Sequence, residues 1–192
     1  FRSPHAQLSL TEGFSVLMVE SLRAGRLDMA VLYNPAPSPD LEMQVLHEDT
    51  LVVIAGKKRQ PLTNTALLKN VVQLADLAKL PLIAPSGPNA FRLLIDTEMQ
   101  RLNCKPNIVL EIDGLNAILE LTKEGLGYAV LPAYTLSNFA SPQDFTTHRI
   151  EKPKLRSQLM LVWSARRPMT ATHKAAMQLT HDVVSQALQA NS

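Results

Sequence analysis

The side chains best suited to bind a small molecule follow a short apolar run in the middle of the chain. Pro85-Ser86-Gly87-Pro88-Asn89 lies between the apolar residues 82–84 and an amphipathic run at 90–102. This pattern predicts a strand, a turn and a helix start. The first turn of a helix has free N–H groups and the positive end of the helix dipole, which favour an anion. Ser86, Gly87 and Asn89 are therefore candidate binding residues, with helix capping as the alternative role of Ser86.

A second candidate pair, Leu115 and Asn116, follows the apolar run 108–112. An Asn side chain can both donate and accept hydrogen bonds, and Leu115 offers an apolar wall. An ordinary first helical turn is the alternative interpretation. Arg92 lies one turn into the helix predicted at 90–102 and could reach a carboxylate, although a solvated helix face is the favoured interpretation.

The stretch 108–132 predicts a βαβ unit. An apolar run with β-branched residues is followed by Leu115, Ile118 and Leu119 at helical spacing, and then by the short apolar run 128–131, which Pro132 ends. Such units form a parallel sheet flanked by helices. Ligands of open α/β sheets bind beyond the carboxyl ends of the strands, where both candidate groups lie in this prediction.

Catalytic and metal-ligating patterns are missing from the sequence. The five histidines are scattered, and His173 and His181 are not separated by the i, i+4 spacing of a helical metal pair. Cys104 is the only cysteine, so no internal disulfide is possible and a reducing compartment is favoured. Paired catalytic carboxylates and a Gly-rich phosphate loop are both lacking. We therefore expect no catalytic residue, metal site or cofactor.

The composition is that of an ordinary globular protein, with 46% hydrophobic and 19% charged residues in a chain of 192. The formal net charge of +2 is too small to indicate binding to nucleic acid or to an anionic membrane. No apolar run approaches the ~20 residues that cross a bilayer. The first residues, Phe1-Arg2-Ser3-Pro4, show no basic and apolar leader and suggest the middle of a longer protein.

The remaining elements predict two small α/β lobes. A first βαβ unit is expected over 7–33, with a strand at 7–10, a helix at 14–23 and a strand at 27–33. A short helix is expected at 72–78 and an amphipathic helix at 172–190. Two extended connectors would join the lobes and leave a cleft between them. We expect lobe I to contain residues 1–51 and 164–192, and lobe II to contain residues 52–163. Strands are expected at 41–45 and 51–55, with a break at His47-Glu48-Asp49.

Five short motifs in this order resemble the effector-sensing domain of LysR-type transcriptional regulators, and their spacing is similar to that of the nitrogen-assimilation branch. None is specific alone, but together they cover nearly the whole chain. They are Glu12-Gly13, Gly25-Arg26-Leu27-Asp28-Met29-Ala30, the crossover segment 46–53, Ala75-Asp76-Leu77 before Pro81-Leu82-Ile83, and Gly125 to Pro132.

The resemblance implies a fold like that of the type 2 periplasmic binding proteins, namely two Rossmann-like lobes joined by two crossover strands. It also implies that the turn Gly13-Phe14-Ser15 contacts a small effector, expected to be anionic, and that Pro85 shapes the cleft. The family's helix-turn-helix is absent from this chain, as are a strand and a helix that precede Phe1 in the family pattern. DNA would therefore be bound only by the full-length protein, as a cytoplasmic homodimer or tetramer without contact to a membrane.

Two other classes of protein remain open from the sequence. An extracytoplasmic solute-binding protein of a transport system shares the two-lobed design, and a secretion leader upstream of Phe1 would favour it. An enzyme is disfavoured because no nucleophile, base or metal constellation is present.

Overall fold

The computed structural model describes residues 7–13, 15–57, 70–137 and 139–189. The chain divides into two compact units: unit 1 contains Phe1–Glu48 and Gln158–Ser192, and unit 2 contains Asp49–Ser157. Strands β2 (Leu41–Gly56) and β8 (Arg156–Ser164) each continue from one unit into the other, so the two predicted crossover strands are confirmed. The division falls slightly before the predicted lobe boundaries, which follow Leu51 and Trp163.

Unit 2 is built on a mixed sheet with two helices. Strand β2 pairs antiparallel with β6 (Ala129–Pro132) on one side and with β7 (Phe145–Glu151) on the other. Strand β3 (Val71–Gln73) extends this sheet parallel to β7, while β4 (Leu82–Ala84) and β5 (Ile108–Glu111) form a parallel pair. A parallel bridge between Leu82 and Tyr128 places β4 next to the start of β6.

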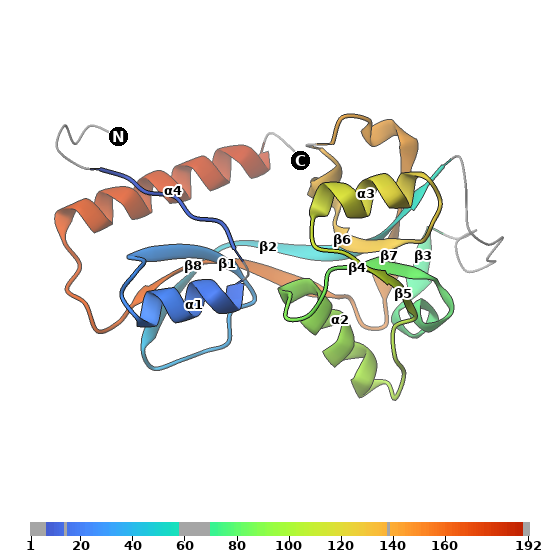
Figure 1. Ribbon diagram of the computed structural model, residues 1–192, viewed down its shortest axis with the longest axis horizontal. Coiled ribbons are helices and arrows are strands. Elements are labelled where there is room, and N and C mark those ends of the chain that lie inside the picture. The colour runs from blue at the N-terminus through green and yellow to red at the C-terminus, as the bar shows by residue number, and fades with distance from the viewer. Residues whose placement is uncertain (1–6, 14, 58–69, 138, 190–192) are drawn as a thin grey trace. The chain divides into compact units, whose positions relative to one another are not determined.

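Helices α2 (Ala90–Arg101) and α3 (Leu115–Lys123) cover opposite faces of this sheet (Figure 1). Side chains of β2 contribute to the apolar core on both faces of the sheet, because neighbouring residues of a strand point to opposite faces. Val53 packs in the cluster that contains Met99 of α2, whereas Ile54 packs in the cluster that contains Leu119 of α3. A continuous apolar run is thus explained by a strand that is buried on both sides.

The predicted βαβ unit over 108–132 is confirmed as β5, α3 and β6, with β4 between the two strands. The close approach of β4 and the start of β6 depends on Gly127. A Cβ atom at this position would lie 2.7 Å from Cγ1 of Ile83 and 2.8 Å from the carbonyl oxygen of Pro81. A larger residue would therefore push the two segments apart.

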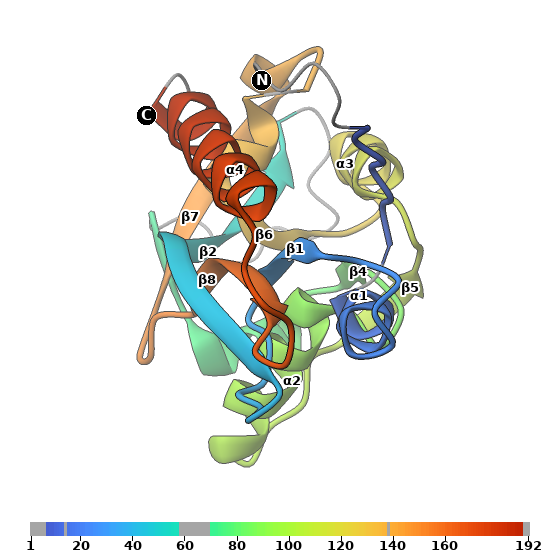
Figure 2. The ribbon, with the colours of Figure 1, turned by 90° about the vertical axis from the view of Figure 1, so that its left-hand side faces the viewer.

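In unit 1, β1 (Met29–Tyr33) is the edge strand of the six-stranded sheet and pairs antiparallel with β8, the neighbour of β2. Helices α1 (Ser15–Arg23) and α4 (Ala171–Gln189) lie on opposite faces of β1 and β8 (Figure 2). The buried cluster under α1 consists of Leu22, Leu32, Leu41 and Val162.

Three predicted elements are wrong. Residues 7–10 form no strand, because an isolated extended segment has no partner for its hydrogen bonds. Leu8 and Leu10 in this segment are 60% and 86% exposed. The charged residues 47–49 do not break β2, which continues through them; Glu48 accepts a hydrogen bond from the side chain of Gln158 on β8 at 2.6 Å. The short helix predicted at 72–78 begins instead as β3, paired with β7, and continues as the 3-10 helix Leu74–Lys79.

In the described parts of the chain, no helix is both long and apolar enough to cross a lipid bilayer.

Candidate functional site

The turns that follow β4 and β5 are joined by hydrogen bonds. Because β4 and β5 are parallel neighbours, their carboxyl ends lie at the same edge of the sheet. The N–H and Oγ of Ser86 both donate to Oδ1 of Asp113, at 3.1 Å and 2.8 Å. The structure therefore brings the predicted Pro85–Asn89 turn next to the segment that leads into Leu115 and Asn116.

Asn89, and not Ser86, is the N-cap of α2. Its Oδ1 accepts hydrogen bonds from the backbone N–H groups of Phe91 at 2.9 Å and Arg92 at 3.3 Å. The alternative role of Ser86 as a helix cap is thus wrong, and two N–H groups at the start of α2 are already satisfied. Of the other turn residues, Pro85 is buried and Gly87 is exposed.

The start of α3 is more open to a ligand. Its N-cap is Gly114, which has a φ of 143° and provides no side-chain hydrogen bond. Leu115 and Asn116 are both exposed in the first turn of this helix. The N–H groups of this turn thus receive no side-chain cap from Gly114, and they are donors for a carboxylate or a hydroxyl group.

Arg92 contacts carboxylates of the chain itself, so the expected solvated helix face is wrong for this residue. Its Nη1 lies 2.6 Å from Oε1 of Glu111, and its Nε lies 2.8 Å from Oδ2 of Asp96. Partial burial alone would lower the pKa of Arg92, but hydrogen bonds and charge interactions with these two carboxylates raise it above its ordinary value. The guanidinium is therefore paired with two carboxylates, and its structural role is to tie α2 to β5.

Asp113 was not identified from the sequence, although it connects the two predicted turns. A local signal was present, since Asp113 stands between the strand run 108–112 and the first helical turn. Its partner Ser86 lies 27 positions earlier, and only the parallel pairing of β4 and β5 brings the two together.

The remaining predicted binding residues belong to unit 1. Gly13 is exposed at the end of an irregular segment, and Ser15 is half-buried at the start of α1. Phe14 lies outside the described residues. These residues and the Ser86–Asp113 group thus belong to different units of the chain.

No acidic, cysteine or histidine cluster of three or more side chains that could hold a metal ion occurs within the described ranges. Cys104 is half-buried, and its Sγ donates to the carbonyl oxygen of Met99 at 3.4 Å. This setting is that of a structural thiol that packs at the end of α2.

Among proteins of known role, the chain is similar to transcriptional regulators. It is 32% identical over 130 residues to the HTH-type transcriptional regulator BbuR of Bordetella bronchiseptica, a match that covers 68% of this chain and 38% of that protein. It is 25% identical over 182 residues to the nitrogen assimilation regulatory protein nac of Escherichia coli, covering 95% of this chain and 57% of nac. The chain spans about half the length of these relatives. Their names favour regulation over transport and over an enzymatic role.

Solved structures share the fold at low sequence identity. The regulatory domain of Synechocystis CcmR in complex with 2-PG matches with a TM-score of 0.79 at 18% identity, covering 92% of this chain and 83% of that one. The effector-binding domain of QuiR in complex with shikimate matches with a TM-score of 0.73 at 19% identity, covering 91% and 79%. These matches confirm the predicted two-lobed α/β fold.

The family profile described as the LysR substrate binding domain matches residues 2–185, which is nearly the whole chain. The motifs that carried the resemblance all lie within this match. The chain therefore belongs to the family of LysR substrate binding domains.

Proposed function

We propose that this chain is the effector-sensing domain of a LysR-type transcriptional regulator. A small molecule would bind to this domain and bias an equilibrium between two of its states. The full-length protein, as a homodimer or tetramer in the cytoplasm, would pass this bias to a helix-turn-helix that contacts DNA. The observation that carries the proposal is the family match across nearly the whole chain.

In unit 2, the effector would contact the group formed by the two turns after β4 and β5. Ser86 supplies an N–H and a hydroxyl, which the effector would take over from Asp113, and the start of α3 supplies N–H groups that Gly114 does not cap. Asn116 adds an exposed amide, and Leu115, which is 43% exposed, adds an apolar wall. In unit 1, Gly13, Phe14 and Ser15 remain the proposed contacts.

The chemistry of these groups fits a small hydroxy acid. Neutral donors can hold a carboxylate at a helix N-terminus without a cationic side chain. This matters because Arg92 is already paired with Asp96 and Glu111. The related domains of CcmR and QuiR were solved with 2-PG and shikimate, so both of these compounds belong in the first set tested.

The experiment is a thermal-shift screen of small hydroxy acids against this chain, followed by calorimetry on any compound that raises the melting temperature. We expect Ser86→Ala and Asn116→Ala each to weaken binding by about five- to tenfold, the loss of one hydrogen bond of about 1 kcal/mol. Ser137→Ala and Asn107→Ala are matched controls, since both residues are exposed and lie elsewhere in unit 2. Unchanged affinity in both test variants would reject this site.

A further inference from the structure

A half-open pocket in unit 1 gathers an unusual set of soft side chains. It contains three of the seven methionines, Met29, Met169 and Met177, together with His173 and the single tryptophan, Trp163. The pocket is partly open to solvent. We propose that it binds a soft monovalent metal ion, with copper(I) as the natural ligand class. This site is independent of the proposed effector site.

The elements of unit 1 place these side chains together. In the antiparallel pairing of β1 and β8, Met29 lies directly opposite Trp163, so both point to the same face of the sheet. Helix α4 covers that face (Figure 2). Because Met169, His173 and Met177 are spaced at four-residue intervals, they occupy one side of α4 and of the turn that leads into it.

The start of α4 is fixed by Thr170. Its Oγ1 accepts a hydrogen bond from the N–H of His173 at 3.2 Å, and its carbonyl oxygen accepts one from Lys174 at 3.1 Å. This cap determines which residues form the first helical turn. It thereby holds His173 at the pocket, with Met169 just before the helix.

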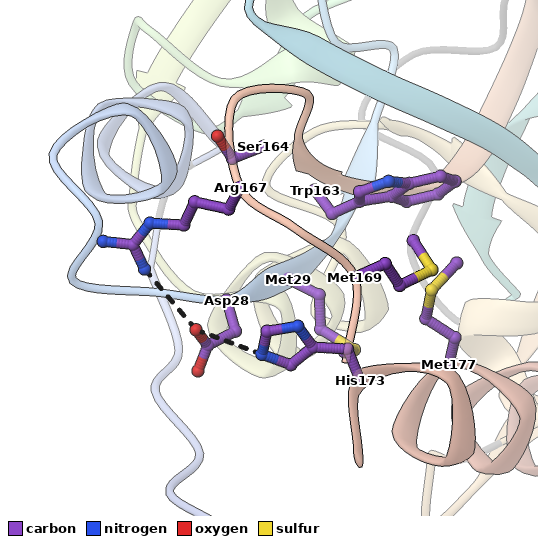
Figure 3. A pocket seen from close by; sticks show the side chains of 8 residues that line it. All are labelled: Asp28, Met29, Trp163, Ser164, Arg167, Met169, His173 and Met177. Atoms are coloured by element: carbon purple, nitrogen blue, oxygen red, sulfur yellow. Dashed lines mark ion pairs between the residues drawn. The ribbon is translucent and has the colours of Figure 1, made fainter. Parts of the chain in front are cut away.

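The donor set selects the class of metal. Thioether sulfur is a soft ligand that favours Cu(I), and imidazole is an additional ligand for copper. Figure 3 shows Met169 and Met177 turned toward one another and toward the ring of Trp163. An aromatic face next to a bound cation adds a favourable cation–π interaction. Three thioethers, one imidazole and one indole therefore suit a monovalent ion with few ligands.

His173 has the contact that a metal-binding histidine usually has. Its Nε2 lies 3.5 Å from Oδ1 of Asp28. A carboxylate at one ring nitrogen orients the imidazole and leaves the other nitrogen for the metal. Nη1 of Arg167 lies 3.6 Å from the same oxygen of Asp28, so the carboxylate also offsets the one permanent positive charge at the pocket.

Simple packing is the competing explanation, because methionine sulfur also makes favourable contacts with aromatic rings. The other four methionines provide an internal comparison. Met18, Met43 and Met160 pack against the core of unit 1, and Met99 lies in the core of unit 2. If the pocket methionines only fill space, silver(I) should perturb none of the seven in preference to the others.

The test is a titration of Ag⁺, a redox-inactive mimic of Cu(I), into the chain labelled with ¹³C at the methionine methyl groups. Cys104 is the one competing thiol, so the titration is repeated on Cys104→Ser after circular dichroism confirms its fold. We expect Cys104→Ser to bind one ion per chain. The methyl signals of Met29, Met169 and Met177 should shift, those of the other four should stay, and the fluorescence of Trp163 should be quenched.

Affinity for Cu(I) is then measured without oxygen, by competition with a coloured Cu(I) chelator. The Met169→Leu/Met177→Leu double variant should bind at least about tenfold more weakly, and His173→Gln should also lose affinity. Met43→Leu and Met160→Leu are the matched controls and should bind as the parent does. The proposal is overturned if Cys104→Ser binds neither ion, or if the double variant keeps the parent affinity.

Discussion

Units 1 and 2 differ in how much apolar side chain they bury. Among the described residues, unit 1 contributes only 5 of the 30 buried apolar side chains, although it contains nearly half of the chain. Its edge strand β1 exposes Val31, and α1 exposes Val16 and Leu17. In unit 2, β2 and β6 are buried on both faces by α2 and α3.

From this contrast we expect the two units to differ in local stability. Hydrophobic burial is the main favourable term in folding, so the unit with fewer buried apolar groups should open at a lower free energy. A lower local stability of unit 1 would suit the proposed response of the domain to a bound ligand.

The largest expected effect comes from equivalent cavities in the two cores. Leu119 in unit 2 and Leu22 in unit 1 are each 1% exposed. Leu119→Ala should lower the free energy of unfolding by about 3–5 kcal/mol, because its densely packed surroundings cannot collapse into the cavity. Leu22→Ala should cost about 2 kcal/mol, since its partly buried neighbours can move. Urea unfolding with native-state hydrogen exchange measures both, and equal costs would contradict the contrast in packing.

A smaller effect is expected for the ion pairs of α2. Arg92→Met removes a guanidinium that is paired with Asp96 and Glu111, and should cost about 1 kcal/mol of unfolding free energy in unit 2. Arg101→Met is the matched control on the same helix, since Arg101 is 69% exposed and paired only with Glu98. This control should change stability by at most about 0.5 kcal/mol. If both variants cost the same, Arg92 does not anchor α2 to β5.

The smallest expected effect has the opposite sign. Thr122 of α3 is fully buried, and its Oγ1 has no hydrogen-bond partner in the described structure. Thr122→Val should therefore leave stability unchanged or raise it by about 1 kcal/mol. Thr135→Val should lower stability by about 1 kcal/mol, because the Oγ1 of Thr135 donates to the carbonyl oxygen of Pro132 at 2.7 Å. Thermal unfolding compares the two, and a destabilised Thr122→Val would indicate a partner for that hydroxyl.

The sequence predicted those elements whose cause is local. The βαβ unit β5–α3–β6 and the helix α2 are marked by apolar periodicity and by turn residues at their ends. Residues 7–10 also alternate, but a strand forms only when another strand supplies its hydrogen bonds, and no local pattern reveals that partner. Strand β3, found where a helix was predicted, depends in the same way on pairing with β7. The continuation of β2 through residues 47–49 is accompanied by the hydrogen bond from Gln158 of β8 to Glu48.

The candidate site was predictable only in part. Ser86 and Asn116 could be proposed because each follows an apolar run and precedes or opens a helix. The roles of Asn89 as cap and of Asp113 as partner of Ser86 depend on side-chain geometry and on strand order. The pocket of methionines depends on the register that sets Met29 opposite Trp163, which no spacing along the chain reveals.

The bonds from Ser86 to Asp113 have a consequence for affinity. The carboxylate of Asp113 already accepts hydrogen bonds from both donors of Ser86. A ligand that binds at this turn must therefore displace that carboxylate. Because Asp113 belongs to the same chain, its carboxylate has a high effective concentration at Ser86, on the order of millimolar or above. The measured affinity would thus understate the intrinsic strength of the hydrogen bonds between Ser86 and the ligand. Removal of the Asp113 carboxylate should increase the affinity for an acidic ligand.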